Sequence, residues 1–99
     1  MAVYTVGLWR VKSGEEDAFV SAWRDMATKT AAAFPGASAV LLQDRQTPGL
    51  FVSSGPWESL DQIESWRAST TFTVGVAAIR PYLDGFEPHT MDVVVTIGG

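Results

Sequence analysis

The sequence of 99 residues contains no cysteine and only one histidine, His89. The lack of cysteine excludes disulfides, thiolate nucleophiles and cysteine-ligated zinc. The sequence also lacks paired catalytic carboxylates, a Ser/His/Asp set, a glycine-rich phosphate loop and a metal-ligand cluster, which disfavours hydrolysis, phosphoryl transfer and metal catalysis. The residue types that usually mark enzyme chemistry are therefore scarce, and we expect no metal site.

Positive charge is sparse as well. Seven Lys and Arg residues against eleven Asp and Glu residues give a net charge of -4, and the scattered cations form no basic patch of the kind that binds nucleic acid or anionic lipid. No apolar run is long enough to span a membrane, and the N-terminal residues show no charged region or cleavage site of a signal peptide. These features predict a cytoplasmic protein without a nucleic-acid or membrane partner.

Apolar and aromatic residues are abundant instead. Hydrophobic residues make up 46% of the chain and four of them are tryptophans, Trp9, Trp23, Trp57 and Trp66. For one small domain this is a heavy apolar load, which points toward an oligomer or a ligand cavity. Because no linker or internal repeat is visible, we expect residues 1–99 to form a single domain.

The first half of the chain predicts a strand, a helix and a hairpin. Residues 2–11 are apolar on both alternating faces, which indicates a strand covered on both sides. A capping box from Ser13 to Glu16 predicts the start of a helix that ends at Pro35-Gly36. Its predicted apolar stripe consists of Phe19, Trp23, Met26, Ala27, Thr30 and then Ala33 or Phe34. Strands are then expected over 37–46 and 50–55, joined by a tight turn in which Gly49 takes a positive φ.

The second half predicts a broken helix and a last strand. Ser59 and Gln62 form a second capping box, and the apolar stripe that follows is interrupted at residues 68–70. The stripe resumes through Phe72, Val76, Ile79 and Leu83, and Pro81 is expected near the helix end. Residues 90–97 alternate apolar and polar side chains, which predicts the final strand.

The element order β-α-β-β-α-β predicts the fold class: an α+β, ferredoxin-like domain with a four-stranded antiparallel sheet and both helices on one face. The other face of the sheet is then uncovered. Because Tyr4, Val6 and Leu8 are apolar on that side of the first strand, we expect two subunits to join there as a homodimer, forming a dimeric α+β barrel.

Several motifs resemble one known family. They are the start of the first helix at Gly14–Phe19, the break at Phe34–Gly36, and the segment Trp57–Leu60 with Trp66 nine residues after Trp57. Together with the element order, they resemble the antibiotic biosynthesis monooxygenase family of dimeric α+β barrels, over residues 3–97. That family includes cofactor-free oxygenases that oxidise anthrone or quinol intermediates, and related haem-degrading enzymes, with a pocket between sheet and helices.

The resemblance implies particular positions. In the cofactor-free group it implies a role for the tryptophan at the strand-helix join, here Trp57; an asparagine four residues earlier is Ser53 here, and a tyrosine six residues later is Ile63. In the haem-degrading group it implies a role for Trp66; the strand-one asparagine is Gly7 here. The haem-binding histidine is replaced by Gly75 or Val76, so an axial ligand is missing.

Each candidate residue also has a purely structural interpretation. Trp57 and Trp66 either pack in the core or form the walls of an apolar slot whose indole N–H groups steady a substrate oxyanion. His89, placed in a loop, is either solvated or a general base. Arg80 and Tyr82 either complement the helix terminus or bind a substrate anion at the pocket mouth. The residues predicted to contact substrate are Gly7, Trp9, Ser53, Ile63, Phe72, Val76, Arg80 and Tyr82.

The leading hypothesis is a monooxygenase that needs no cofactor and acts on an aromatic, polyketide-type small molecule with dioxygen as co-substrate. A deprotonated anthrone or quinol can itself give an electron to dioxygen, so the protein need only exclude water, orient the ring and stabilise the anion. Two alternatives stay open. One is a binding module for a hydrophobic metabolite without catalysis, and the other is a haem-degrading oxygenase.

Overall fold

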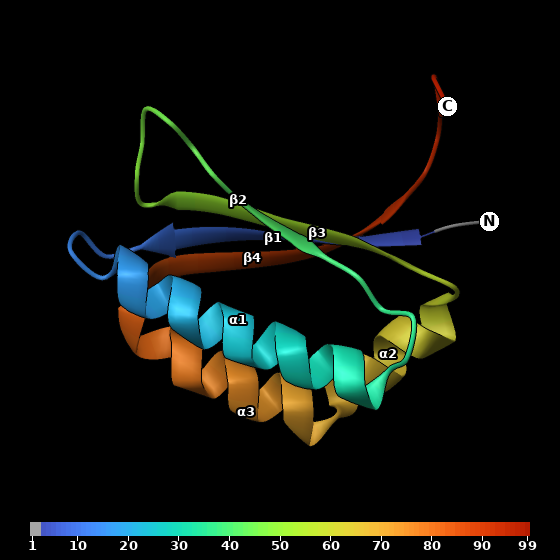
Figure 1. Ribbon diagram of the computed structural model, residues 1–99, viewed down its shortest axis with the longest axis horizontal. Coiled ribbons are helices and arrows are strands. Elements are labelled where there is room, and N and C mark those ends of the chain that lie inside the picture. The colour runs from blue at the N-terminus through green and yellow to red at the C-terminus, as the bar shows by residue number, and fades with distance from the viewer. Residues whose placement is uncertain (1–2) are drawn as a thin grey trace.

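An antiparallel sheet covered on one face by helices makes up the computed structural model, which describes residues 3–99 (Figure 1). The elements, in chain order, are β1 (Val3–Val11), α1 (Glu16–Ala33), β2 (Val40–Gln43), β3 (Leu50–Trp57), α2 (Leu60–Ala68), α3 (Thr70–Ile79), the 3-10 turn η1 (Arg80–Tyr82) and β4 (Leu83–Asp92). The strand order is β2-β3-β1-β4. The predicted ferredoxin-like fold class is thus confirmed, with three helices rather than two.

The central strand β1 sets which side chains face the helices. Gly7 pairs with Ser53 on β3 and with Pro88 on β4. Because side chains alternate along a strand, the odd-numbered residues of β1 face the helices and the even-numbered ones face away. Burial follows this alternation, since Val3, Gly7, Trp9 and Val11 are buried whereas the even-numbered residues are only partly covered or exposed.

Two aromatic clusters fill the space between sheet and helices. In the first, the Trp9 ring stacks on Phe86 at 4.0 Å and meets Phe19 at 5.4 Å between ring centroids, and the fully buried Phe19 and Ile79 bring α1 and α3 into contact with the sheet. The second cluster packs Trp57 against Val3 and Ile63 at the α2 end of the sheet.

Helix α1 buries the predicted stripe, with Phe19, Met26 and Thr30 buried toward the sheet. Its predicted start is wrong in detail. Gly14 takes a φ of 87°, and the Glu16 carboxylate accepts a hydrogen bond from the Gly14 amide at 2.9 Å, whereas no side chain caps the helix at Glu15. The left-handed turn at Gly14 delays the helix start, so Ser13 is not in a position to cap it.

The predicted break in the second helix is confirmed at Ser69, which ends α2 and begins α3. Its side chain donates to the carbonyl of Trp66 and accepts from the amide of Phe72. The predicted capping box forms in part. The Gln62 backbone amide donates to Ser59 Oγ at 3.1 Å, but Gln62 Oε1 accepts from the amide of Glu58 at 3.0 Å, one residue before the N-cap.

The last strand was predicted at the wrong place. Instead of spanning 90–97, β4 runs from Leu83 to Asp92, and it pairs with β1 from Leu83 opposite Val11 to Asp92 opposite Val3. The alternating segment 93–97 therefore lies beyond the paired region and forms no strand, with Val94 89% and Ile97 91% exposed. Leu83 accordingly begins β4 instead of continuing a helix.

The β2–β3 hairpin also differs from prediction. Strand β2 covers only Val40–Gln43, and β3 extends to Trp57. Gly49 does not take a positive φ. It is needed for a close approach instead, because a Cβ there would lie 2.7 Å from the carbonyl oxygen of Val11, whose amide donates to the Gly49 carbonyl at 2.8 Å.

Within residues 3–99, no helix combines the length and the apolar character that crossing a membrane requires.

Candidate functional site

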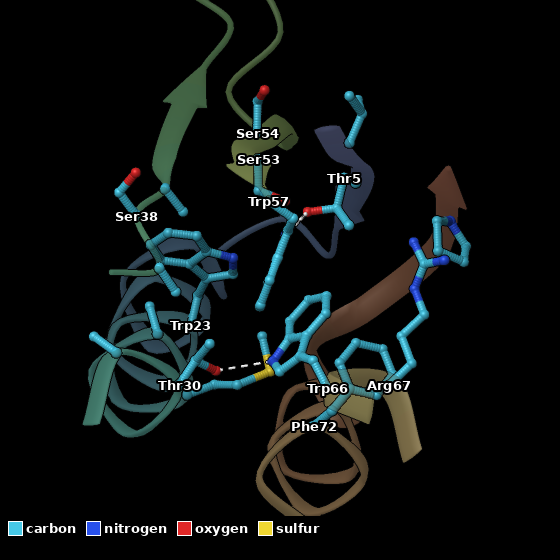
Figure 2. A pocket seen from close by; sticks show the side chains of 18 of the residues that line it. Thr5, Trp23, Thr30, Ser38, Ser53, Ser54, Trp57, Trp66, Arg67 and Phe72 are labelled. Atoms are coloured by element: carbon cyan, nitrogen blue, oxygen red, sulfur yellow. Dashed lines mark hydrogen bonds between the residues drawn. The ribbon is translucent and has the colours of Figure 1, made fainter. Parts of the chain in front are cut away.

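A cavity of about 380 Å³ lies between the sheet and the helix layer. Its lining comes from α1 and the loop between α1 and β2, from β1, β3 and β4 of the sheet, and from α2 and α3. Figure 2 shows it from close by, with Trp23 and Thr30 on the α1 side and Trp66, Arg67 and Phe72 on the side of α2 and α3. Apolar side chains dominate the lining, as expected for a small-molecule site.

Aromatic rings form one wall of this cavity. Trp57 and Trp66 pack with ring centroids 5.0 Å apart and planes inclined at 33°, and Phe72 meets Trp66 edge-on at 4.7 Å. Trp57 lies at the end of β3, and Trp66 lies on the inner face of α2. A planar ring system could stack on these side chains.

Three of the four indole N–H groups are already used inside the protein. The indole of Trp9 donates to Ser53 Oγ at 2.9 Å, that of Trp57 to Thr5 Oγ1 at 3.0 Å, and that of Trp66 to Thr30 Oγ1 at 3.0 Å. The bond from Trp66 gives the hydroxyl of the buried Thr30 a partner. The indole N–H of Trp57 or Trp66 could donate to a ligand only if its hydrogen bond to Thr5 or Thr30 were broken.

The exception is Trp23, which sequence reasoning assigned only to the apolar stripe of the first helix. It lines the cavity and its indole nitrogen points into it (Figure 2). Within residues 3–99, no hydrogen bond joins this indole to another residue. Ser53 adds a second donor, because its oxygen accepts from Trp9 and its own hydroxyl hydrogen remains free to donate.

The structure brings six of the ten predicted site residues to the cavity lining, namely Gly7, Trp9, Ser53, Trp57, Trp66 and Phe72. The other four do not line it. Ile63 is buried beneath Trp57 in the second cluster, Val76 is buried in the first, and Tyr82 packs against that first cluster from outside. Arg80 is exposed at the end of α3.

His89 lies in β4 rather than in a loop. It pairs with Val6, so its side chain is on the face of the sheet away from the helices, whereas its neighbour Pro88 lines the cavity. The predicted loop position of His89 is therefore wrong, and its side chain does not face the cavity. The sequence misplaced it because the last strand begins seven residues earlier than predicted, at Leu83 rather than residue 90.

The described residues offer no cluster of three or more His, Cys, Asp or Glu side chains that could hold a metal ion. The positions implied for haem binding are also filled by packing. Val76 is buried in the core, and a Cβ at Gly75 would collide with the side chain of Met26.

Gly7 is expected to be sensitive to a single added methyl group. A Cβ at Gly7 would lie 2.7 Å from Ser53 Oγ and 2.8 Å from Trp9 Nε1, on the hydrogen bond that joins them. We expect Gly7→Ala to lower the free energy of unfolding by about 1–3 kcal/mol, measured by chemical denaturation. Gly85→Ala is the matched control, since its nearest atoms lie 3.7 Å or more away; equal stability of both variants would contradict this account of Gly7.

Comparison with known proteins identifies the family of this chain. The sequence model described as "antibiotic biosynthesis monooxygenase" matches residues 2–78. The chain therefore belongs to the antibiotic biosynthesis monooxygenase family, as its motifs predicted.

Solved structures with the same fold agree. The chain is similar to a variant of SnoaB, a cofactor-independent oxygenase from Streptomyces nogalater, with a TM-score of 0.87 and 22% identity over 99% of this chain and 98% of that one. A Caulobacter crescentus protein named for the same family gives a TM-score of 0.85 at 21% identity, covering 95% and 91% of the two chains. A Chloroflexus aurantiacus protein also named for the family gives a TM-score of 0.77 at 22% identity, over 99% of this chain and 98% of that one. No curated protein sequence matches this chain.

Proposed function

We propose that the protein is a cofactor-independent monooxygenase that oxidises an electron-rich aromatic molecule of the anthrone or quinol type in the cavity beside Trp57 and Trp66. The observation that carries this proposal is the cavity itself: an apolar space of about 380 Å³ with an aromatic wall and free hydrogen-bond donors. Family membership and the likeness to SnoaB support it, since that oxygenase is cofactor-independent.

Oxidation of an anthrone by dioxygen needs no redox group from the protein. Loss of a proton from the activated carbon of an anthrone gives an anion that transfers an electron to dioxygen. A carbon–oxygen bond then forms, the O–O bond breaks, and the second oxygen atom leaves as water while the carbon becomes a carbonyl. No external reductant is needed, because the substrate supplies the electrons.

The cavity residues have matching roles in this scheme. Stacking on Trp57, Trp66 and Phe72 holds the ring and keeps water from it. The Trp23 indole N–H and the Ser53 hydroxyl donate to the oxygen on which negative charge develops, which lowers the energy of the anion. Because no His, Asp or Glu among residues 3–99 lines the cavity, the proton passes to a water molecule at the mouth of the cavity rather than to a side-chain base.

Oxygen consumption with an anthrone such as 1,8-dihydroxyanthrone tests the proposal. The protein, purified free of metal and haem, is expected to consume one dioxygen per anthraquinone formed, faster than the spontaneous reaction. Replacing Trp57 and Trp66 together by leucine is expected to lower kcat/KM at least about tenfold, because the stacking wall is lost. An unchanged rate in the double variant would refute the assignment.

A binding module without catalysis is the second candidate. One observation favours it: the indole N–H groups of Trp57 and Trp66 are satisfied by Thr5 and Thr30 and so serve structure. Calorimetric titration with the anthraquinone product, next to the oxygen assay, separates the two candidates. Saturable binding without any acceleration of oxygen uptake would leave only the binding module.

We also propose that the protein acts as a homodimer joined through the sheet face that carries no helix. Tyr4, Val6 and Leu8 of β1 face that side, flanked by Val40 and Leu42 of β2 and Met91 of β4. The flanking three remain 55%, 56% and 46% exposed. An apolar sheet face left open in a single subunit is typical of an interface between subunits.

A further inference from the structure

The charged residues around the cavity differ in sign from the chain as a whole. The protein carries eleven acidic and seven basic residues, yet the two charged residues that line the cavity are both arginines, Arg24 from α1 and Arg67 from α2. Among residues 3–99, no carboxylate lines it to neutralise them. A largely apolar cavity with charge of one sign in its walls concentrates the field on whatever enters it.

Arg67 is held in place without being neutralised. Its Nη1 donates to Thr90 Oγ1 at 2.7 Å and its Nη2 to the His89 carbonyl at 3.2 Å, both on β4. Both acceptors are uncharged, so they orient the guanidinium and leave its charge uncompensated. Within residues 3–99 the ion pair found joins Lys29 to Asp25, not Arg67 to a carboxylate.

One nitrogen of Arg67 also lacks a hydrogen-bond partner among residues 3–99. Its Nε is buried and has no hydrogen-bond partner among the described residues. An unpartnered buried donor on a charged group is costly and calls for an explanation. Because an arginine presents paired N–H groups that match a carboxylate, and each Nη atom of Arg67 carries a second N–H besides the one bound to β4, an acidic group of the ligand would supply the negative charge that the protein lacks.

Arg24 adds a second positive charge to the cavity lining. It follows Trp23 on α1, is exposed and forms no ion pair in the described part of the chain. Figure 2 shows Trp23 and Arg67 on opposite sides of the cavity. The cavity therefore has cationic groups on both its helical walls, with the free indole donor beside one of them.

We infer that the ligand of this cavity carries an ionised carboxylate beside its aromatic rings, and that Arg67 is the residue that binds this carboxylate, with Arg24 attracting it from the other wall. This inference rests on the proposed role of the cavity as the substrate site. It names Arg67 as a residue that determines specificity and gives it no part in the oxidation.

Calorimetric titration of the full chain with 2-naphthoate and with 2-naphthamide at pH 7 and low salt tests the inference. The two compounds share a ring system and differ in charge, because a carboxylic acid is ionised at pH 7. We expect 2-naphthoate to bind at least about tenfold more tightly. In Arg67→Gln the preference is expected to fall to within about twofold, with binding of 2-naphthamide unchanged. Arg45→Gln, which removes a cation from an exposed loop away from the cavity, is expected to keep the full preference.

Two further variants keep the result interpretable if Arg67→Gln folds poorly. Arg67→Lys retains the charge and is expected to keep part of the preference for 2-naphthoate over 2-naphthamide. In Arg24→Gln, at an exposed position, the same preference is expected to fall a few-fold. Equal affinity of wild-type protein for both compounds, or an undiminished preference in Arg67→Gln, would overturn the inference and leave the oxygenase proposal to its own assay. Failure of both compounds to bind would overturn this inference as well, and absence of oxygen uptake with an anthrone would then remove the proposed function too.

Discussion

Replacement of Trp23 by phenylalanine is expected to lower kcat for anthrone oxidation by about 10²-fold, the usual effect of removing one hydrogen bond to a developing anion. The variant keeps an aromatic ring on the α1 side of the cavity and removes only the indole N–H. Of the four tryptophans, Trp23 is the one whose N–H points into the cavity and makes no bond within residues 3–99. Its contribution is therefore available to the substrate.

Separate values of kcat and KM distinguish this role from simple packing. Loss of a bond that strengthens in the transition state lowers kcat and leaves KM nearly unchanged, whereas loss of stacking area raises KM. Trp66→Phe is the informative comparison, because it removes an N–H that Thr30 uses. We expect that variant to lose stability, by about 1 kcal/mol, and only a small part of its kcat. Equal losses of kcat in both variants would refute the special role of Trp23.

The fold could be predicted from the sequence because its signals are local. The interruption of the apolar stripe at residues 68–70 predicts the break at Ser69. The spacing of Ser59 and Gln62 predicts the second capping box. The last strand could not be placed in this way. Its alternation continues past Asp92, but where a strand begins and ends depends on its pairing partner, and β4 pairs with β1 from Leu83, opposite Val11, to Asp92, opposite Val3.

The site was predictable only where a residue's role follows from its own strand or helix. Trp57 and Trp66 stood out at a strand-helix join and on a helical face. Trp23 did not, because a tryptophan on the stripe of a helix has the same pattern whether it fills the core or faces a cavity. The distinction depends on how α1 lies over the sheet, which is a tertiary property. Arg67 was missed for the same reason, since its orientation is fixed by Thr90 and His89 on the distant strand β4.

The proposed dimer predicts a large effect from charges on the open sheet face. Val40 and Leu42 are 55% and 56% exposed in the single subunit, so the double substitution Val40→Glu/Leu42→Glu costs the subunit little burial. In a homodimer the same side chains of two sheets are brought together, and the substitution would place unpaired carboxylates in an apolar interface. We expect the dissociation constant of the dimer to rise at least about 10²-fold, measured by sedimentation equilibrium.

A control with the same added charge is available on the helix layer. Leu60 on α2 and Val74 on α3 are 55% and 63% exposed, and neither lies on the sheet. Leu60→Glu/Val74→Glu is therefore expected to leave the dimer intact. If both double variants remain dimers, the open sheet face is not the interface; if the wild-type protein sediments as a monomer, the proposed dimer is wrong. The cavity lies on the other side of the sheet and is lined within one subunit, so ligand binding by a dissociated variant would show that it needs no partner.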